Sequence, residues 1–387
     1  MEKRCLLIVS YDKYPNGNAG AVRQHAFAKL YQECGFDVVV VGMGDSTDFT
    51  VKEYDGVKYT SFRRMPNNTI NKALNWFLYG RRLRKFIRTC GFEFTDVLFV
   101  NTYFSSVLAW IKRYCRKRGI GLFHDSVEWY SPEEFKLKKC DIAYVKNNRL
   151  NTKEIDKSFK VIAISRYLFD HYRSRGIDAI RIPVIMDSKS ISYEKNTRGD
   201  KLIVSYAGRI GKKDYIGNII RAFLLLSDDE KAKIELRLMG ANIDEASQIT
   251  GISKDDLERN RDVIHCMGRV PRSVVLQNLQ ETDFTVLIRG SSLRYARAGF
   301  PTKVVESLMS GTPVICNLSS DLDEYLIDGE NAVIVKDMDI QSVAQALRSA
   351  LEIPFEKRKE MQARARKTAE EFFDYRRYVD VFREWSK

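Results

Sequence analysis

The stretch AGFPTKVVESLMSGTPVI, residues 298–315, decides the fold because it contains a loop, a short helix and a buried strand in close succession. Its glycines and prolines predict a loop over 299–302, with Thr302 as the cap of a helix over 303–310. Gly311 predicts the end of that helix, and a strand follows directly. The backbone N–H groups at the start of such a helix can bind an anion.

Around this stretch, short apolar runs alternate with longer amphipathic stretches along almost the whole chain. This alternation is typical of βαβ units, so the predicted fold class is α/β with parallel sheets. The length of 387 residues exceeds one ordinary core and suits two doubly wound domains. Because ligands bind at the carboxyl ends of the strands in such domains, we expect the active site in a cleft between them.

The sequence predicts two domains joined by a polar segment without apolar pattern. The first domain covers 1–184, the linker 185–200 and the second domain 201–365, and the tail 366–387 belongs to a long terminal helix that packs back on the first domain. The predicted strands of the first domain are 5–10, 38–41, 97–100, 121–124 and 161–164, with helices such as 22–34 and 105–118. The predicted strands of the second domain are 202–207, 234–239, 263–266, 284–288, 312–316 and 332–335, before a helix over 340–351.

The composition excludes several classes of protein. With 44% hydrophobic and 30% charged residues, the chain is not disordered as a whole. It has no run of 18 apolar residues, and its start lacks the pattern of a secretory signal, so we expect a protein that neither spans a membrane nor is exported. The seven scattered cysteines include no CxxC pair, which predicts reduced structural thiols and a cytosolic location.

The net charge of +13 is concentrated in the first half of the chain. Residues 1–199 hold 35 Lys and Arg against 21 Asp and Glu, whereas residues 200–387 hold 29 against 30. Within 51–118 there are 15 basic and 4 acidic residues. A patch of this kind predicts an anionic partner, either lipid or nucleic acid.

The segment 71–88 is the most basic part of this patch, and its apolar residues recur near helical spacing. Such a helix either lies on an anionic membrane surface or packs on the core with a solvated basic face. Gly80 weakens the helix prediction. The candidate membrane and acceptor patch consists of Lys72, Trp76, Arg81, Arg82, Arg84, Lys85 and Arg88.

The motif YAGRIGKKD, residues 206–214, follows a predicted strand and precedes a predicted helix. Gly208 and Gly211 permit a tight turn, and cations beside a helix start suit a diphosphate. The spacing matches neither a P-loop nor a dinucleotide fingerprint, so a plain turn with solvated lysines is the alternative. Lys303 and Glu306, three residues apart, could likewise form only a surface ion pair.

Taken together, these motifs resemble the retaining nucleotide-sugar glycosyltransferases of family 4, which have the GT-B fold. The order is a strand followed by Gly-Arg and a nearby lysine, then residues 298–315, then DGENAVIV at 328–335. The resemblance covers 202–350, and more weakly PNGNAGAVRQHAFAKLYQECGFDVVVVG at 15–42 and VIAISRYL at 161–168. It implies two Rossmann-like domains facing across a cleft, with the C-terminal helix returning to the first domain.

The resemblance also implies a donor site in the second half. Arg209 and Lys213 match the basic pair that clamps the donor diphosphate, with Lys212 as an alternative lysine. Glu306 matches the second glutamate of the family's E-x7-E motif, which holds the ribose hydroxyls. Ala298 stands where that motif has its first glutamate, and we hypothesise that Lys303 supplies a charge to the donor instead. The loop residues expected beside the donor are Gly299, Phe300, Pro301 and Thr302.

In the first half, the loop GNAGAVR at 17–23 matches a glycine-containing loop that approaches the donor phosphate, with Gly20 allowing close backbone approach. Arg23 either contacts an anion or, as is usual in a first helical turn, is solvated.

The segment HDSVEW, residues 124–129, is expected at the mouth of the cleft, where the predicted strand ends. His124 and Asp125 are candidates to contact sugar hydroxyls, and Asp125 or Glu128 to receive the acceptor proton. The alternative is that Asp125 or Ser126 merely caps the next helix.

The predicted function is transfer of a sugar from a nucleoside-diphosphate sugar to a hydroxyl of a glycan or lipid-linked glycan, with retention, as in hexosyltransferases of class EC 2.4. We expect no cofactor, no metal and no nucleic-acid partner. The basic patch predicts a cytoplasmic protein held peripherally at the inner face of the membrane, and bacterial surface polysaccharide biosynthesis is the expected pathway. The alternatives are a GT-B nucleotide-sugar 2-epimerase and a basic nucleic-acid-binding protein with a degenerate GT-B domain.

Overall fold

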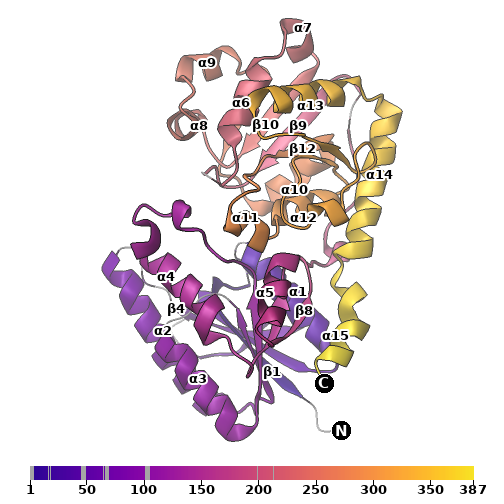
Figure 1. Cartoon of the computed structure of the whole chain (residues 1–387). Helices are drawn as coiled ribbons and strands as arrows, with labels where there is room; N and C mark the ends of the chain where they lie inside the picture. The colour runs from indigo at the N-terminus through magenta and orange to yellow at the C-terminus, as the bar shows by residue number, and fades with distance from the viewer. Residues whose placement is uncertain are drawn as a thin grey trace. The chain divides into compact units, whose positions relative to one another are not determined.

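The structure is a computed structural model that describes residues 4–15, 17, 19–44, 49–63, 65, 69–100, 105–197, 199–211 and 213–387, without the side chains of 69–73 and 76. The chain packs into two compact units, which Figure 1 shows coloured along the chain. The first unit comprises Met1–Met186, Ala298–Phe300 and Asp374–Lys387, and the second comprises Asp187–Arg297 and Pro301–Phe373.

The first unit is built on a sheet that has eight strands among the described residues, in the order β3-β4-β2-β1-β5-β6-β7-β8. Neighbouring strands run parallel, except that β3 and β4 form an antiparallel hairpin. The central strands are buried apolar runs, as expected where helices cover both faces. The strands are β1 Cys5–Lys13, β2 Asp37–Gly44, β3 Lys52–Tyr54, β4 Val57–Arg63, β5 Asp96–Val100, β6 Gly121–Ser126, β7 Lys160–Ala163 and β8 Asp178–Arg181.

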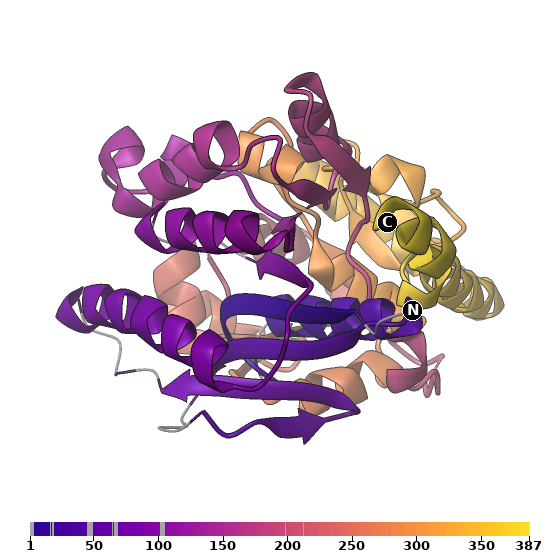
Figure 2. The same cartoon turned by 90° about the horizontal axis from the view of Figure 1, so that it is seen from below.

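Figures 1 and 2 show helices α2, α3 and α4 along one flank of this sheet. On the other face α1 packs against the end of the chain, where the ring of Tyr31 lies 4.8 Å from that of Phe382. The helices of this unit are α1 Ala19–Glu33, α2 Thr69–Thr89, α3 Ser105–Arg118, α4 Ile142–Arg149, α5 Arg166–Ser174 and α15 Val379–Trp385, with short turns η1 Pro132–Glu134, η2 Lys138–Cys140, η6 Tyr375–Tyr378 and a π-helical turn η3 Leu150–Glu154.

The second unit contains a parallel sheet, described with six strands in the order β11-β10-β9-β12-β13-β14. Its strands are β9 Leu202–Ala207, β10 Ile234–Met239, β11 Ile264–Gly268, β12 Phe284–Leu287, β13 Val314–Cys316 and β14 Ala332–Ile334. Its helices are α6 Ile216–Leu224, α7 Asp228–Lys231, α8 Ile243–Thr250, α9 Lys254–Arg259, α10 Arg272–Glu281, α11 Arg294–Ala298, α12 Thr302–Met309, α13 Ile340–Glu352 and α14 Phe355–Phe372, with turns η4 Ser188–Ser190 and η5 Leu322–Glu324.

The predicted α/β architecture is confirmed, and every predicted strand is present with small shifts of its ends. The hairpin β3–β4 and the edge strand β8 were not predicted. The prediction of a single terminal helix is wrong, because α14 ends at its C-cap, Phe373. Asp374 then begins a new turn by accepting a hydrogen bond from Arg376 N. The end of the tail does pack on the first unit, as predicted.

Gly80 does not interrupt α2, contrary to the sequence argument. A Cβ atom at this position would lie 2.8 Å from Cγ2 of Val107 in α3. The glycine therefore serves close packing of two helices, and the cost of a glycine within a helix is offset by that contact.

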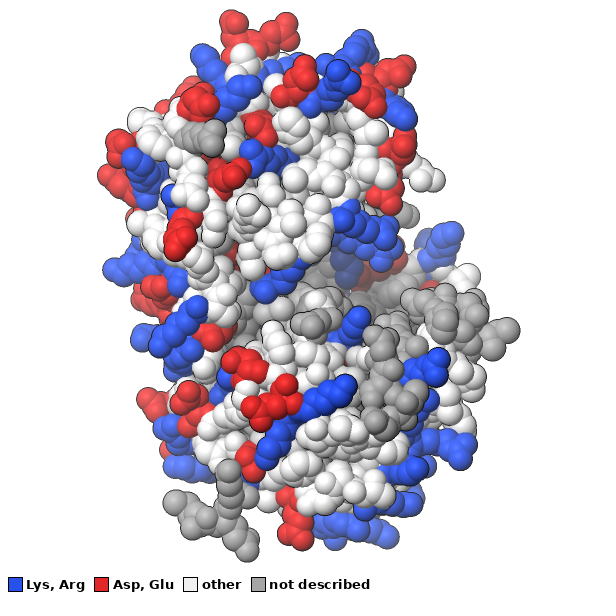
Figure 3. Space-filling model, turned by 180° about the vertical axis from the view of Figure 1, so that it is seen from behind, with Lys and Arg blue, Asp and Glu red and all other residues white. Residues whose placement is uncertain are grey.

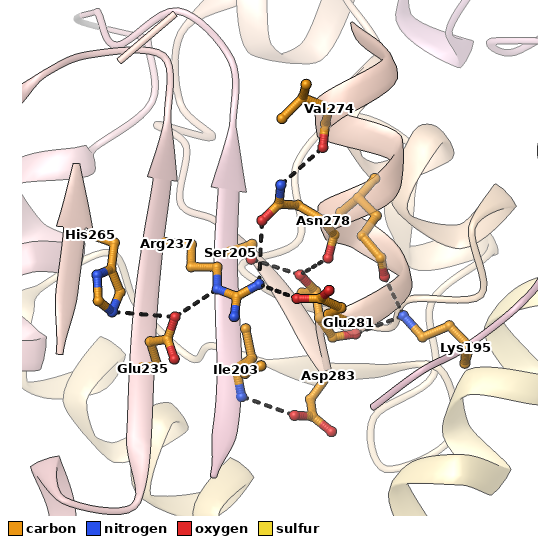
Figure 4. Close-up of polar contacts among 12 residues, drawn as sticks. Lys195, Ile203, Ser205, Glu235, Arg237, His265, Val274, Asn278, Glu281 and Asp283 are labelled. Carbon is orange, nitrogen blue, oxygen red and sulfur yellow. Dashed lines mark hydrogen bonds and ion pairs between the residues drawn. The ribbon is translucent and has the colours of Figure 1, made fainter. Parts of the chain in front are cut away.

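The segment 187–200, predicted as part of a linker, bonds to the second unit. Lys195 Nζ donates to the carbonyl oxygens of Leu279 and Thr282 and to Oγ1 of Thr312, the last two at 2.7 and 2.9 Å. Figure 4 shows this lysine reaching the end of α10, on which Arg237 of β10 also bonds to Glu281 at 2.8 Å. These polar contacts stabilise the sheet and its helix.

Candidate active site

Helix α12 begins at Thr302, and its N-cap is Pro301 rather than the predicted Thr302. Proline has no side-chain acceptor, so the first N–H groups of α12 are not capped by it and can bind a ligand. Gly311, in the left-handed conformation at φ 68°, follows the helix as predicted. Gly299 and Phe300 belong to the first unit, together with Ala298, whose carbonyl accepts from Ser165 Oγ at 2.8 Å.

Lys303, in the first turn of α12, forms an ion pair with the buried Asp214. Its Nζ also donates to the hydroxyl of Tyr206 at 2.6 Å, and that hydroxyl donates to Asp214 Oδ2 at 2.7 Å. Burial lowers the pKa of Lys303 and Asp214 offsets part of this effect, while burial and the same carboxylate raise the pKa of Tyr206. Lys303 is therefore fixed at the carboxyl end of β9 instead of reaching into solvent.

Arg289, just beyond β12, is a second cation on the same carboxylate, with its Nε 2.7 Å from Asp214 Oδ1. Burial alone would raise the pKa of Asp214, but Arg289 and Lys303 lower it to about 2. Asn317 clamps the backbone of Arg289, accepting from its N–H at 2.8 Å and donating to its carbonyl at 2.7 Å. Two cations thus share one carboxylate where neighbouring parallel strands end.

Arg209 and Lys213 lie in the loop that joins β9 to α6. Arg209 is exposed and has no ion-pair partner among the residues that the structure describes. Lys213 is half-buried, with Nζ 5.1 Å from the ring centre of Tyr295. Lys212, the alternative lysine, lies outside the described residues. The predicted basic pair therefore belongs to the same edge of the sheet as Lys303 and Arg289.

Gly208 lets Lys303 cross the backbone at the end of β9. Its φ of 145° is a conformation that other residues rarely adopt, and a Cβ there would overlap Cε of Lys303. Gly240, at the end of β10, has φ 149°, and its own Cβ would overlap the carbonyl oxygen of Gly208. These glycines therefore allow Lys303 and the backbone of Gly208 to pack closely at this edge of the sheet.

Glu306 is on the same helix as Lys303 and contacts Arg272 of α10 at 3.3 Å. Burial raises the pKa of Glu306, and Arg272 offsets part of this shift. A pocket of the second unit is lined by apolar side chains and by Tyr206, Lys303 and Glu306. The structure therefore brings the two predicted residues of α12 together with the end of β9.

His124 and Asp125 do not stand at the end of a strand, and the predicted strand end is wrong. Strand β6 continues to Ser126, and His124 and Asp125 are 2% and 1% exposed. Successive strand residues face opposite sides of a sheet, so these two side chains diverge. Burial lowers the pKa of His124 to about 4. Their expected contacts with sugar hydroxyls stay predictions, and in this structure both side chains are enclosed.

The carboxylate of Asp125 is paired with Arg23, which is buried rather than solvated. Arg23 donates from Nε at 2.9 Å and from Nη2 at 2.8 Å to the two carboxylate oxygens. Nη2 also donates to the carbonyl oxygen of Ile182, at 3.2 Å, and Nη1 donates to that of Pro183, at 2.5 Å. The pair ties α1 to β6 and to the chain after β8. Neither Asp125 nor Ser126 caps a helix, because Ser131 is the next cap residue.

Glu128 is the predicted carboxylate that does lie exposed beyond the end of β6. Its backbone is fixed, because its carbonyl accepts from Nδ2 of Asn147 at 3.1 Å and of Asn151 at 3.3 Å. Asn151 belongs to the π-helical turn η3, a local irregularity often found at functional sites. Burial and the Glu128 carboxylate raise the pKa of Tyr130. Gly20, half-buried, is the second residue of α1.

The basic face of α2 is exposed at Arg81, Lys85 and Arg88, whereas Arg82 and Arg84 are half-buried. Arg82 donates to the carbonyl of Arg63, and Arg84 stacks 5.0 Å from the ring of Trp110. Figure 3 shows Lys and Arg side chains along the right-hand edge of the first unit. Lys72 and Trp76 lie in α2, but their side chains are outside the described residues.

Asp214, Arg289, Asn317 and Tyr206 were missed as site residues by the sequence argument. The motif at 206–214 contains Tyr206 and Asp214, but only its glycines and cations match the pattern of an anion site. Arg289 directly follows a predicted strand, so its place at a carboxyl end could have marked it. Nothing local distinguishes Asn317.

Two protein-family models match the chain in succession. The model described as Glycosyltransferase Family 4 matches residues 20–186, and that described as Glycosyl transferases group 1 matches residues 187–368. The chain is a family 4 glycosyltransferase. As such it has the GT-B fold, uses a nucleotide-sugar donor and is a transferase of class EC 2.4, as predicted.

This family 4 enzyme is 22% identical over 319 residues to an uncharacterized glycosyltransferase of Methanocaldococcus jannaschii, covering 76% of this chain and 74% of the other. Sucrose-phosphate synthase from Thermosynechococcus elongatus shares the fold with a TM-score of 0.75 at 14% identity, covering 99% of this chain and 98% of that one. HepE from Anabaena, solved with UDP and glucose, has a TM-score of 0.69 at 14% identity over 98% of both chains.

The helices of the enzyme, as far as the structure describes them, include none with both the length and the hydrophobicity needed to cross a bilayer.

Proposed function

We propose that the enzyme transfers a sugar from a nucleoside-diphosphate sugar to a hydroxyl of a glycan or lipid-linked glycan with retention. The donor binds in the second unit and the acceptor in the first, consistent with predicted domains 1–184 and 201–365. One observation carries the proposal: Lys303 and Arg289 converge on a single carboxylate, Asp214, beside the uncapped start of α12.

The charge of this cluster fits a diphosphate. Asp214 is ionised at neutral pH, because Arg289 and Lys303 lower its pKa to about 2, so two cations share one negative charge. Arg209 and Lys213 add two further cations in the neighbouring loop. The diphosphate is stabilised by cations that are already held in place before it binds. These cations need no reorganisation when the bond between the diphosphate and the sugar breaks.

Glu306 is proposed to hold the ribose. Its contact with Arg272, at 3.3 Å, is long for a charge-assisted hydrogen bond and leaves the carboxylate available to two hydroxyl donors. Gly299, Phe300, Pro301 and Thr302 are proposed as the donor-side loop.

Ala298 carries no charge, and Lys303 is proposed to supply a charge to the donor instead. We propose that its ammonium stabilises the diphosphate leaving group as the bond between the anomeric carbon and the phosphate oxygen breaks. The acceptor oxygen then bonds to that carbon, and its proton passes to Glu128 or to the departing phosphate. Glu128 is favoured over Asp125, because Asp125 is enclosed by Arg23.

The exposed cations of α2, Arg81, Lys85 and Arg88, are proposed to bind anionic lipid. The enzyme would then work peripherally at the inner face of the cytoplasmic membrane, where lipid-linked acceptors for bacterial surface polysaccharides are found. No metal and no cofactor are part of this proposal.

A thermal-shift series tests the donor site. UDP, GDP, ADP and CMP are compared with their sugar conjugates, beginning with uridine compounds because HepE binds UDP. A ligand at 100 times its Kd adds about 2.7 kcal/mol of stability. We expect one diphosphate series to stabilise the protein and the effect to be lost in Arg209→Ala and Glu306→Ala. Arg259→Ala, at an exposed position on α9, is the matched control.

Stabilisation that persists in both site variants would place the donor elsewhere. A transfer assay with the selected donor and isolated membrane lipids as acceptor, with NMR of the product linkage, then tests retention.

A further inference from the structure

The segment 135–146, which contains η2 and the first turn of α4, carries apolar side chains that the fold does not bury. Ile142, Leu137 and Phe77 are 72%, 66% and 61% exposed, the highest values among the large hydrophobic residues that the structure describes. Val145, one turn beyond Ile142, is 47% exposed. The side chains of Leu137, Ile142 and Val145, all within this short segment, are thus exposed to solvent, which is costly unless a partner covers them.

These apolar side chains are interleaved with cations. The described residues offer no ion-pair partner to the three exposed lysines of the segment. Asp141 is engaged as the N-cap of α4, accepting from Ala143 N at 2.9 Å, and the remaining acidic groups nearby are upstream in η1. The exposed lysines are Lys136, Lys138 and Lys139, and the acidic residues of η1 are Glu133 and Glu134.

The base of the segment is held firmly while its outer side is free. Asn147, on the buried side of α4, accepts from Tyr130 N at 2.8 Å, and Leu150 is 3% exposed. Lys138 has a φ of 47°, a turn conformation that is uncommon outside glycine. The exposed side chains of the segment therefore contribute little to the fold, while the helix that follows is anchored to the first unit.

We propose that the segment 135–146 inserts Leu137, Ile142 and Val145 into the interfacial layer of an anionic phospholipid bilayer. Apolar side chains ringed by unpaired lysines match a surface with anionic headgroups above hydrocarbon, because the cations meet phosphates while the apolar groups leave water. Figures 1 and 2 place α4 on the same flank of the first sheet as α2, whose Phe77 and basic residues would meet the same surface.

Insertion of this segment rests on the proposed membrane binding of the enzyme. In that binding, α2 supplies salt-sensitive attraction and the segment 135–146 supplies insertion. Full burial of one aliphatic side chain strengthens binding by about tenfold or more, and a side chain that is only partly buried contributes less. We expect Leu137→Ser with Ile142→Ser to weaken binding of the full-length protein to vesicles of phosphatidylcholine and phosphatidylglycerol by about 10- to 100-fold, because the two side chains enter only the interfacial layer.

The matched control is Leu225→Ser with Ile249→Ser, two apolar residues of the second unit that are 46% and 48% exposed. This variant should bind vesicles like the wild type. In the α2 variant Arg81→Gln with Lys85→Gln, the loss of binding should be large at low salt and small at high salt, whereas the loss in the 137/142 variant should persist at high salt.

Cys140 provides a second readout, because it is the exposed one of seven cysteines, all of which the structure describes. An environment-sensitive fluorophore on this thiol should shift to the blue with anionic vesicles and be quenched by lipids brominated near the headgroup. Vesicles of phosphatidylcholine alone should give neither change.

Unchanged vesicle binding in the 137/142 variant, or a label that stays in water while the protein is bound, would overturn the inference. A 137/142 variant that loses self-association in sedimentation velocity but still binds vesicles would also overturn it. The surface would then join copies of the chain. Donor-induced thermal shifts without vesicles test the proposed function separately, and we expect them to be equal in the wild type and the 137/142 variant.

Discussion

Asp125 in the first unit and Asp214 in the second are both buried carboxylates paired with cations, Asp125 within β6 and Asp214 in the loop after β9. The Arg23 side chain is 6% exposed and donates hydrogen bonds to Asp125 and to two backbone carbonyls. Around Asp214, the side chains of Lys303 and Arg289 are 28% and 20% exposed and share one carboxylate.

We interpret the first as a structural pair and the second as part of the proposed donor site. A buried pair with matched charges has no net charge to offer a ligand, whereas two cations on one carboxylate leave positive charge where a ligand can reach it. Burial and charge alone therefore do not distinguish the proposed site from a structural ion pair, whereas unequal charge with partial exposure does.

The largest effect is expected from Arg23→Ala, which leaves Asp125 charged and buried. We expect a loss of about 3–5 kcal/mol in the free energy of unfolding of the first unit. Thermal and urea denaturation measure it. If the pair is structural, Arg23→Ala with Asp125→Ala should recover part of the loss, because no buried charge remains. A loss below about 1 kcal/mol, the range of exposed ion pairs, would contradict this interpretation.

Lys303→Ala tests the other side of the comparison. We expect kcat/KM for sugar transfer to fall about 100- to 1000-fold, the usual cost of removing one preorganised charge-stabilising group. The melting temperature should change little, because Arg289 still pairs with Asp214. Lys254→Ala, on an exposed lysine of α9, is the control. Unchanged transfer by Lys303→Ala would remove the proposed role.

His124, the neighbour of Asp125 on β6, should make the first unit sensitive to acid. Its pKa falls from 6.5 to about 4 on burial, so the unfolded chain binds more protons between these values. Stability should be fully present above pH 6.5 and fall by about 3 kcal/mol as the pH approaches 4. The difference between wild type and His124→Gln in unfolding experiments isolates this contribution. A flat difference curve would contradict the buried, neutral histidine.

Gly208→Ala should produce the smallest change, about 1–2 kcal/mol in transition-state stabilisation or roughly tenfold in kcat/KM. The new methyl group would displace Lys303, because the space that it needs is filled by Cε of that lysine. Gly211→Ala, in the same loop, is the control, because a Cβ there has no atom within 4 Å among the described residues. Equal activity of the two variants would show that the position of Lys303 tolerates a shift.

The α/β fold was predictable because buried parallel strands are continuous apolar runs, which can be recognised in the local sequence. Strand β4 was missed because its burial alternates and it lies in the basic patch, and β8 because an edge strand of the four residues DAIR has little apolar signal. The break before α15 was missed because Asp374 within an aromatic and charged tail looks like any helical residue until its capping bond is seen.

The gathering of Lys303, Glu306, Arg209 and Lys213 near the end of β9 was predictable in outline, because these residues lie in recognisable motifs. The first-unit half of the candidate site was not, because the surroundings of His124 and Asp125 depend on where β6 ends and on Arg23, 102 positions away in sequence. Pairings of that range leave no local pattern. The same holds for Arg289, which reaches Asp214 across 75 positions.

The bonds of Lys195 to the end of α10 determine where the chain can be divided. A fragment of the second unit that began at residue 201 would lose this lysine and leave the hydroxyl of Thr312 and two carbonyl oxygens with one partner fewer. Arg366 of α14, which donates to the carbonyl of Ser188 at 2.9 Å, would lose a partner as well. A donor-binding fragment for separate expression should therefore begin before Ser188, well upstream of its first strand.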